Sequence, residues 1–274
     1  MKDYCLELAA SQKSSAAKYN AMREYLQAYV LRLMHDRGIL RSTAFVGGTA
    51  LRFLHGLPRF SEDLDFSQHK KPAYRTGRPG LSFAGLMNII KQELISAGYE
   101  PSVTFHEVKT VQSAFVRFEG LLYEAKLSPL KAQKFSIKIE IDTNPPQGAV
   151  LATQVVNKFF PIAFLSYDLS SLLSGKIHAL LTRKYTKGRD FFDLGWYLSR
   201  FKTLSPNIKF LRNALTQTGY AKKMPAEKDW RKYLSDAVEK TDWKAVHKDV
   251  VNFLENPKDM DIFTKENVLR LINA

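Results

Sequence analysis

The residues best suited to chemistry are concentrated between Phe45 and Phe66, in the stretch FVGGTALRFLHGLPRFSEDLDF. This stretch ends with Asp63 and Asp65, which are separated by one leucine. In a β-strand, side chains at this spacing project from the same face, so we expect the two carboxylates to lie close together. Neighbouring carboxylates repel each other unless a cation lies between them, and oxygen ligands suit Mg²⁺. The pair therefore predicts a divalent-cation site, although solvated acids on an exposed strand edge would explain the pair alone.

A third acidic side chain is offered by the later stretch FSIKIEIDT. Its alternation predicts a strand whose isoleucines face inward and whose Glu140 and Asp142 face the other way, beside Lys138. Either acid could complete a site for two metal ions, which stabilise the attacking and leaving oxygens of an in-line phosphoryl displacement. The sequence leaves open which of the two it is, and an ordinary polar strand face is the alternative.

The start of the first stretch suggests a phosphate contact. Gly47, Gly48 and Thr49 lie between a buried strand and a helix, where glycines permit close backbone approach and the helix offers free N–H groups. The Thr49 hydroxyl could donate to a phosphate oxygen or cap the helix. Arg52 and Arg59 flank the site and could contact phosphate, or an arginine could brace the acidic strand. Neither GxxxxGK[ST] nor GxGxxG is present, so a P-loop and a dinucleotide fold are not supported.

A second block, SGKIHALLTRKYTKGRDFFDL, follows about a hundred residues later. It contains Lys176, Arg183, Arg189, Asp190 and Asp193. Lys176 and Arg183 are seven residues apart and share one face of the predicted helix. Taken alone, this block is more typical of a structural helix with solvated basic residues.

The periodicity divides the chain into an α/β part, 1–165, and a helical part, 166–274. Before the change in character, helices are expected at 11–36, 49–56 and 81–98 and strands at 42–48, 62–67, 102–108, 113–125 and 135–143, followed by two short apolar runs at 153–160 and 162–168. The segment 68–80 is a loop by its proline and glycine content, and it is rich in Lys and Arg. Its position after the acidic strand places it beside the predicted site.

The composition favours a polyanionic partner. The 274 residues include 41 Lys and Arg against 27 Asp and Glu, a formal charge of +14, which favours nucleic acid, although a soluble basic surface is the simpler reading. Cys5 is the only cysteine, so an internal disulfide and a cysteine-based metal cluster are excluded. Neither a signal peptide nor a membrane span is evident, and we expect a cytoplasmic protein.

Together, the two blocks resemble a known family. A glycine turn opening a helix, then D-x-D on the next strand, then a later acidic strand is similar to the DNA polymerase β-like nucleotidyltransferases. The stretch from Gly47 to Phe66 resembles the signature of the AbiEii/AbiGii toxin family, GG-T/S-x-LR followed by R-x-S-x-DLDF. The second block resembles that family's lysine helix and R-D-x-x-D-L motif. The resemblance implies an α+β fold, with a polymerase β-like core around a mixed sheet followed by a helical C-terminal domain.

The resemblance also implies roles for residues. The metals would be held by Asp63, Asp65 and Glu140 or Asp142, and the nucleotide by Gly47, Gly48, Thr49, Arg52 and Lys176. Asp190 would position or deprotonate the attacking hydroxyl, or help to hold Lys176. Asp193 would cap or brace the following helix. The catalytic set implied by the resemblance is therefore Asp63, Asp65, Lys176 and Asp190.

The implied activity is a Mg²⁺- or Mn²⁺-dependent transfer of a nucleoside monophosphate from an NTP to an acceptor hydroxyl, with release of pyrophosphate. By resemblance, the acceptor is the 3′ end of tRNA, and the protein is the toxin of a toxin–antitoxin, phage-defence system with a cognate antitoxin. We expect a monomer that does not associate with membranes. The alternatives are transfer to a protein or small molecule, and a non-catalytic nucleotide- or RNA-binding module.

Overall fold

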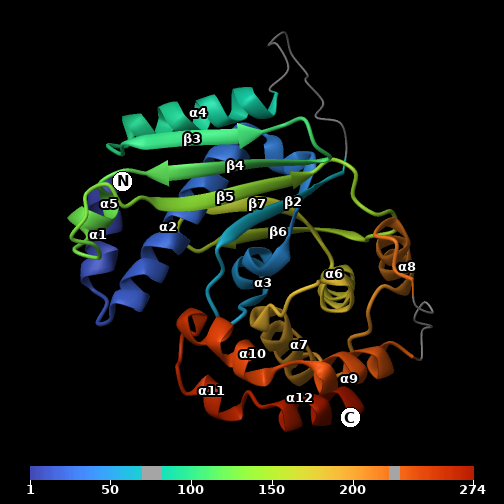
Figure 1. Cartoon of the computed structure of the whole chain (residues 1–274). Helices are drawn as coiled ribbons and strands as arrows, with labels where there is room; N and C mark the ends of the chain where they lie inside the picture. Colours follow the sequence, from blue (N-terminus) through green and yellow to red (C-terminus); the bar gives the residue numbers. More distant parts are fainter. Residues whose placement is uncertain (70–81, 222–228) are drawn as a thin grey trace. The chain divides into compact units, whose positions relative to one another are not determined.

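The strand that carries the paired aspartates lies at the centre of a seven-stranded sheet, in the order β3-β4-β5-β2-β1-β7-β6. The computed structural model describes residues 1–69, 82–221 and 229–274, and Figure 1 shows its elements. By internal contacts the chain divides into two compact units. Unit 1 comprises residues 1–55, 60–145 and 153–166, and unit 2 comprises residues 56–59, 146–152 and 167–274.

The sheet is mixed. Its strands are β1 (Thr43–Val46), β2 (Asp63–Gln68), β3 (Pro101–His106), β4 (Val111–Phe118), β5 (Phe135–Asp142), β6 (Leu151–Asn157) and β7 (Pro161–Tyr167). β2 runs antiparallel to β1 and parallel to β5, while β1 runs parallel to β7. A mixed sheet followed by helices confirms that part of the fold class predicted from the sequence.

Helices cover one face of the sheet in unit 1. The helical elements described in unit 1 are α1 (Lys2–Ala10), α2 (Ser15–Asp36), the 3₁₀ turn η1 (Ile39–Arg41), α3 (Gly47–His55), α4 (Phe83–Ser96) and α5 (Leu121–Glu124), of which α2, α3 and α4 pack on the strands. α2 and α4 contact each other and the strands β3, β4 and β5, as Figure 1 shows, so their apolar residues share one core with the inward side chains of the sheet. The aromatic ring of Phe45 lies in that core, stacked on Phe66 and Phe164 with centroid distances of 5.2 Å to each.

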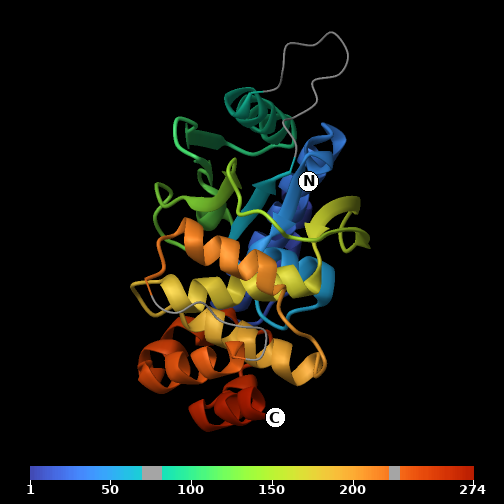
Figure 2. The same ribbon diagram turned by 90° about the vertical axis from the view of Figure 1, so that its right-hand side faces the viewer.

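Unit 2 is built from helices. They are α6 (Leu169–Thr182), α7 (Gly188–Arg200), α8 (Ile208–Gln217), α9 (Trp230–Lys240), α10 (Trp243–Val250), the 3₁₀ turn η2 (Val251–Phe253), α11 (Asp259–Ile262) and α12 (Lys265–Asn273). α7 contacts α6, α10 and α12, and Figure 2 shows α6 and α7 next to each other in a second view. A Cβ atom at Gly188 would overlap the Val246 carbonyl, so only glycine permits this approach of α7 to α10.

One local prediction differs from the structure, and one helix was not predicted. The run 113–125 was expected to be one strand, but β4 ends at Phe118 and Gly120, with φ 69°, leads into the short helix α5. A helix also occupies Lys2–Ala10, where the sequence shows little periodicity, because Cys5 and Ala9 are buried against α2. Residues 70–80 of the predicted basic loop lie outside the described residues.

A search of residues 1–69, 82–221 and 229–274 found no helix that combines the length and the apolar character needed to cross a bilayer.

Candidate active site

The paired aspartates lie on the face of β2 that points away from the core. Leu64 and Phe66 are buried, with exposed fractions of 0% and 2%, whereas Asp63 and Asp65 are only half-buried. This alternation is the one that the sequence predicts, because a strand half-covered by helices turns every second residue outward. Both carboxylates therefore lie on one side of the sheet.

Strand pairing distinguishes the two candidates for a third acid. In the parallel β2–β5 ladder, Asp65 is the register partner of Glu140, while Asp142 is paired with Ser67, one step farther along. Glu140 is thus the acid of β5 that lies beside the aspartates. Its Oε1 also lies 2.8 Å from the Lys138 ammonium group.

Lys138 brings a cation to the acidic face, since its register partner is Asp63. Burial acts to lower the pKa of Lys138, but its hydrogen bond to Glu140 and the charges of Glu140, Asp63 and Asp65 raise that pKa above its ordinary value. Lys138 therefore stays charged and offsets part of the repulsion among the acids.

The glycine turn contacts the second aspartate. Gly47 has φ 78°, and a Cβ atom added there would overlap the carboxylate of Asp65, whose Cγ would be only 3.1 Å away. A side chain at position 47 would therefore meet both backbone strain and a steric clash. Gly48 follows in the first turn of α3 and is buried. The turn thus lies directly against the Asp65 side chain within unit 1.

Thr49 and Arg52 are buried on α3. The Thr49 hydroxyl donates to the Asp63 main-chain carbonyl, which joins the start of α3 to the start of β2. Arg52 forms an ion pair with Glu24 of α2, and its guanidinium carbon lies 4.1 Å from the ring centroid of Phe60. The structure places both residues as braces of the site, and their predicted contacts with phosphate stay predictions.

The donor set fits a metal ion only in part. Among the described residues, no three His, Cys, Asp or Glu side chains are grouped so that they could hold a metal ion. Asp63 and Asp65 nevertheless supply hard carboxylate oxygens from one strand face. Mg²⁺ is usually bound by one or two carboxylates together with substrate phosphates, so the chemistry of the two aspartates suits it.

A second polar cluster lies within unit 2 and contains the other predicted residues. The Lys176 ammonium group is 3.0 Å from Asp190 Oδ1 and 2.6 Å from Asp193 Oδ2. Both aspartates are buried, with exposed fractions of 2% and 0%. Asp193 also accepts hydrogen bonds of 2.6 Å from Nε and Nη2 of Arg59. The cluster therefore joins α6, α7 and the segment that precedes β2 in sequence.

The charges in this cluster stabilise one another. Burial acts to lower the pKa of Lys176, but Asp193 and Asp190 outweigh it and raise that pKa. Burial acts to raise the pKa of Asp190, but Lys176 and Arg183 outweigh it and lower that pKa. Lys176 is therefore a permanent cation and Asp190 a permanent anion near neutral pH.

Asp190 keeps one oxygen without a hydrogen bond. Its Oδ1 accepts from Lys176, while Arg183 Nε lies 3.3 Å from Oδ2 without hydrogen-bond geometry. Within the described part of the chain, Oδ2 is a buried acceptor that receives no hydrogen bond. Such an atom is costly to leave unsatisfied, and a substrate hydroxyl is one group that would satisfy it.

Sequence reasoning missed the partnership of Asp193 with Arg59 and Lys176. Asp193 was expected only to cap or brace a helix, and Arg59 to contact phosphate or brace the acidic strand. A signal was present, because Asp190 and Asp193 are three residues apart and share a helix face. No spacing rule, however, relates Arg59 to a residue 134 positions away.

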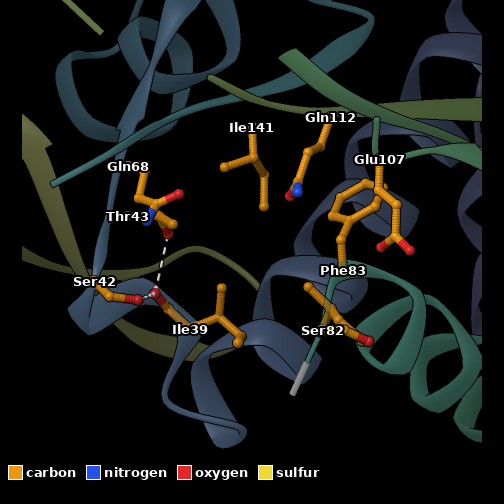
Figure 3. A pocket seen from close by; sticks show the side chains of 10 residues that line it. Ile39, Ser42, Thr43, Gln68, Ser82, Phe83, Glu107, Gln112 and Ile141 are labelled. Atoms are coloured by element: carbon orange, nitrogen blue, oxygen red, sulfur yellow. Dashed lines mark hydrogen bonds between the residues drawn. The ribbon is translucent and has the colours of Figure 1, made fainter. Parts of the chain in front are cut away.

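A cavity of about 340 Å³ lies elsewhere in unit 1, next to the ends of β1, β2 and β5. Figure 3 shows Gln68, Gln112 and Glu107 around it, with Ile141 and Phe83. Gln68 is on the same face of β2 as Leu64 and Phe66, opposite to Asp65. The cavity therefore opens on the helix-covered face of the sheet. It is therefore distinct from the surface of the aspartate pair.

Comparisons with known proteins bear on the fold and on the family of the chain. Two crystal structures from Helicobacter pylori resemble the chain at 18% sequence identity: a candidate nucleotidyltransferase (TM-score 0.54, covering 96% of this chain and 93% of that one) and JHP933 (TM-score 0.50, covering 96% and 91%). At that identity they show a shared fold, which supports the predicted fold class. No curated protein sequence matches significantly. The family model "Nucleotidyl transferase AbiEii toxin, Type IV TA system" matches residues 33–265, and the chain therefore belongs to the AbiEii family of nucleotidyl transferase toxins.

Proposed function

We propose that the protein is a Mg²⁺-dependent enzyme that transfers a nucleoside monophosphate from an NTP to an acceptor hydroxyl at the 3′ end of tRNA. The observation that carries the proposal is the close approach of Gly47 to the carboxylate of Asp65, which shares its strand face with Asp63. A glycine turn touching a carboxylate pair suits a triphosphate and the cation that accompanies it.

In this proposal the chain's own residues bind and orient the reactants. Asp63 and Asp65 would hold Mg²⁺ or Mn²⁺, which neutralises charge on the phosphates when bound. The backbone of Gly47 and Gly48 would approach the phosphates closely. Lys176, kept charged by its two aspartates, would bind the triphosphate. The result is catalysis by positioning and charge neutralisation, which phosphoryl-type transfers require.

Asp190 would orient the acceptor. Its unsatisfied Oδ2 can accept a hydrogen bond from the attacking hydroxyl, while Oδ1 stays bound to Lys176. Because the pKa of Asp190 is lowered, the carboxylate would be a weak base, and we propose that it positions the hydroxyl and does not remove its proton. The formal charge of +14 independently suits a polyanionic acceptor.

Membership of a toxin family adds the biological role. The family comprises toxins of type IV toxin–antitoxin systems, so we propose a cytoplasmic toxin, active in phage defence and balanced by a cognate antitoxin. Capping the 3′ end of tRNA would stop translation, since an amino acid is attached to that end.

The test uses purified protein, total bacterial tRNA, Mg²⁺ and each α-³²P-labelled NTP in turn. We expect label on tRNA with at least one NTP, and none on tRNA whose 3′ diol has been oxidised with periodate. Label on the protein or a small molecule, with tRNA unlabelled, would contradict the proposed acceptor. Absence of transfer to any acceptor, with NTP binding intact, would favour a non-catalytic binding module.

A further inference from the structure

The segment between α6 and α7, RKYTK, and the first two residues of α7, GR, together contain four cations, one aromatic ring and no acid. Arg183, Lys184, Tyr185 and Thr186 are all exposed, and Tyr185 exposes 67% of its surface. Removing an aromatic side chain of this size from water on binding is strongly favourable, so the exposed Tyr185 ring is available to contact a ligand. A ring flanked by cations is the combination that binds unstacked bases and their phosphates.

Arg183 supports the ring. Its guanidinium carbon lies 5.7 Å from the Tyr185 ring centroid, and Nη1 donates to the Tyr185 hydroxyl over 3.4 Å. The same side chain reaches Asp190, with Nε 3.3 Å from Oδ2. Arg183 thus connects the exposed ring directly to the carboxylate that is proposed to orient the acceptor hydroxyl.

Like charges crowd the other end of the segment. Burial lowers the pKa of Lys187, and the charges of Arg189 and Arg183 lower it further, while Asp190 acts in the opposite direction. Arg189 is itself held by Asp249, at 3.3 Å, and stacks on Phe253 with its guanidinium carbon 4.0 Å from the ring centroid. A bound phosphate would relieve the repulsion among these cations.

We propose that the segment from Arg183 to Lys187 binds the single-stranded 3′ end of the RNA acceptor, with one base stacked on Tyr185 and the flanking phosphates paired with Lys184 and Lys187. The inference rests on the proposed function and specifies its acceptor site. Lys184 and Lys187 lie on either side of Tyr185 in sequence, as phosphates lie on either side of a stacked base. A free NTP carries its charge on one side of its base and fits this pattern less well.

The first experiment measures RNA affinity without turnover. A fluorescein-labelled single-stranded RNA of twelve nucleotides is titrated with the full chain, without NTP, and its anisotropy is recorded. Tyr185→Ala is expected to weaken binding about fivefold or more, as loss of one base–aromatic stack does, and Tyr185→Phe to bind within twofold of the native protein. Tyr123→Ala removes another exposed tyrosine, 52% exposed on α5, and is expected to change nothing.

The second experiment measures the charge contribution. Lys184→Ala is expected to reduce the slope of log affinity against log salt by about 0.7, the value for one phosphate of a single strand. Lys202→Ala is the matched control, because Lys202 is exposed and lies next to Ser170, at the opposite end of α6 from Lys184.

A blunt RNA duplex is the control for base stacking. Tyr185→Ala is expected to leave duplex binding unchanged, since duplex bases are not free to stack on the ring.

The inference is overturned if Tyr185→Ala binds the single strand within twofold of the native protein, or if it weakens NTP binding as much as RNA binding. Failure of the proposed function is distinguishable. RNA binding that depends on Tyr185, without transfer to RNA, refutes the function and keeps the site. Transfer to RNA with Tyr185-independent binding refutes the site and keeps the function.

Discussion

Arg59 and Asp193 form a fully buried, two-pronged ion pair, in which Nε and Nη2 of the arginine each lie 2.6 Å from a different oxygen of the carboxylate. Neither side chain exposes more than 2% of its surface. Lys176 is the second cation of Asp193, at 2.6 Å. The Asp193 carboxylate is therefore the shared counter-ion of two cations, and because the site is buried, water cannot solvate those cations in its place.

Removing this carboxylate charge is expected to be costly. Asp193→Asn leaves Arg59 and Lys176 without their shared counter-ion, and breaking a buried pair in this way typically costs about 3–5 kcal/mol. Urea unfolding followed by tryptophan fluorescence measures the loss. Glu239→Gln is the control, because it removes an ion pair with Lys265 whose acid is 55% exposed, and its expected cost is below about 1 kcal/mol. Equal losses in the two variants would contradict the structural role of Asp193.

Gly47→Ala is expected to abolish activity for a reason separate from backbone strain. Gly47 and Gly38 both have positive φ, 78° and 74°, so alanine at either position costs about 1–2 kcal/mol. Only at Gly47 would the new Cβ overlap the Asp65 carboxylate, since nothing lies within 4 Å of a Cβ at Gly38. Unfolding and transfer are measured on both variants. We expect both variants to be destabilised to a similar degree, and only Gly47→Ala to lose transfer. A Gly47→Ala variant that keeps its transfer activity would contradict this prediction.

The two acids of β5 are expected to differ in function. Glu140→Gln alters the register partner of Asp65 and releases Lys138, so kcat/KM should fall about tenfold or more. Asp142 is the register partner of Ser67 and not of an aspartate, so Asp142→Asn should change kcat/KM by less than about threefold. Steady-state transfer at several Mg²⁺ concentrations tests both variants. A larger loss in Asp142→Asn would contradict the proposal that Glu140, and not Asp142, acts with the aspartate pair.

The pairing of Asp190 is expected to make stability depend on pH in the acid range. Because the folded-state pKa of Asp190 lies below the ordinary 3.8, the paired carboxylate stabilises the fold fully above that value. The contribution is lost as pH falls from about 3.8 through the lowered pKa. The free-energy difference between the native protein and Asp190→Asn should therefore be constant from pH 7 to 5 and shrink below pH 4. A difference that stays constant down to pH 3 would show that Lys176 does not hold Asp190.

Much of the aspartate-bearing strand was predictable because its side chains obey a local rule. Alternation alone places Leu64 and Phe66 in the core and Asp63 and Asp65 outside, and the structure confirms it. Which of Glu140 and Asp142 is the register partner of Asp65 was not predictable, because register depends on how β2 and β5 pair, and not on either strand alone.

The acidic partners of the buried arginines could not be predicted from the sequence either. Arg59 and Asp193 are 134 residues apart, and the pairing of Arg52 with Glu24 spans 28 residues. Both arginines look like solvated or phosphate-binding residues when read locally. Only the packing of the helices shows that each is buried with an acid, which a basic side chain requires in a core.

The most direct test of the account is which phosphate of the NTP moves. Native protein and Asp65→Asn are incubated with RNA, Mg²⁺ and an NTP labelled at either the α- or the γ-phosphate. The account predicts that α-label joins the RNA, that γ-label leaves as pyrophosphate, and that Asp65→Asn slows both about a hundredfold or more while still folding. Transfer of the γ-label to RNA, or an Asp65→Asn variant as fast as the native protein, would contradict it.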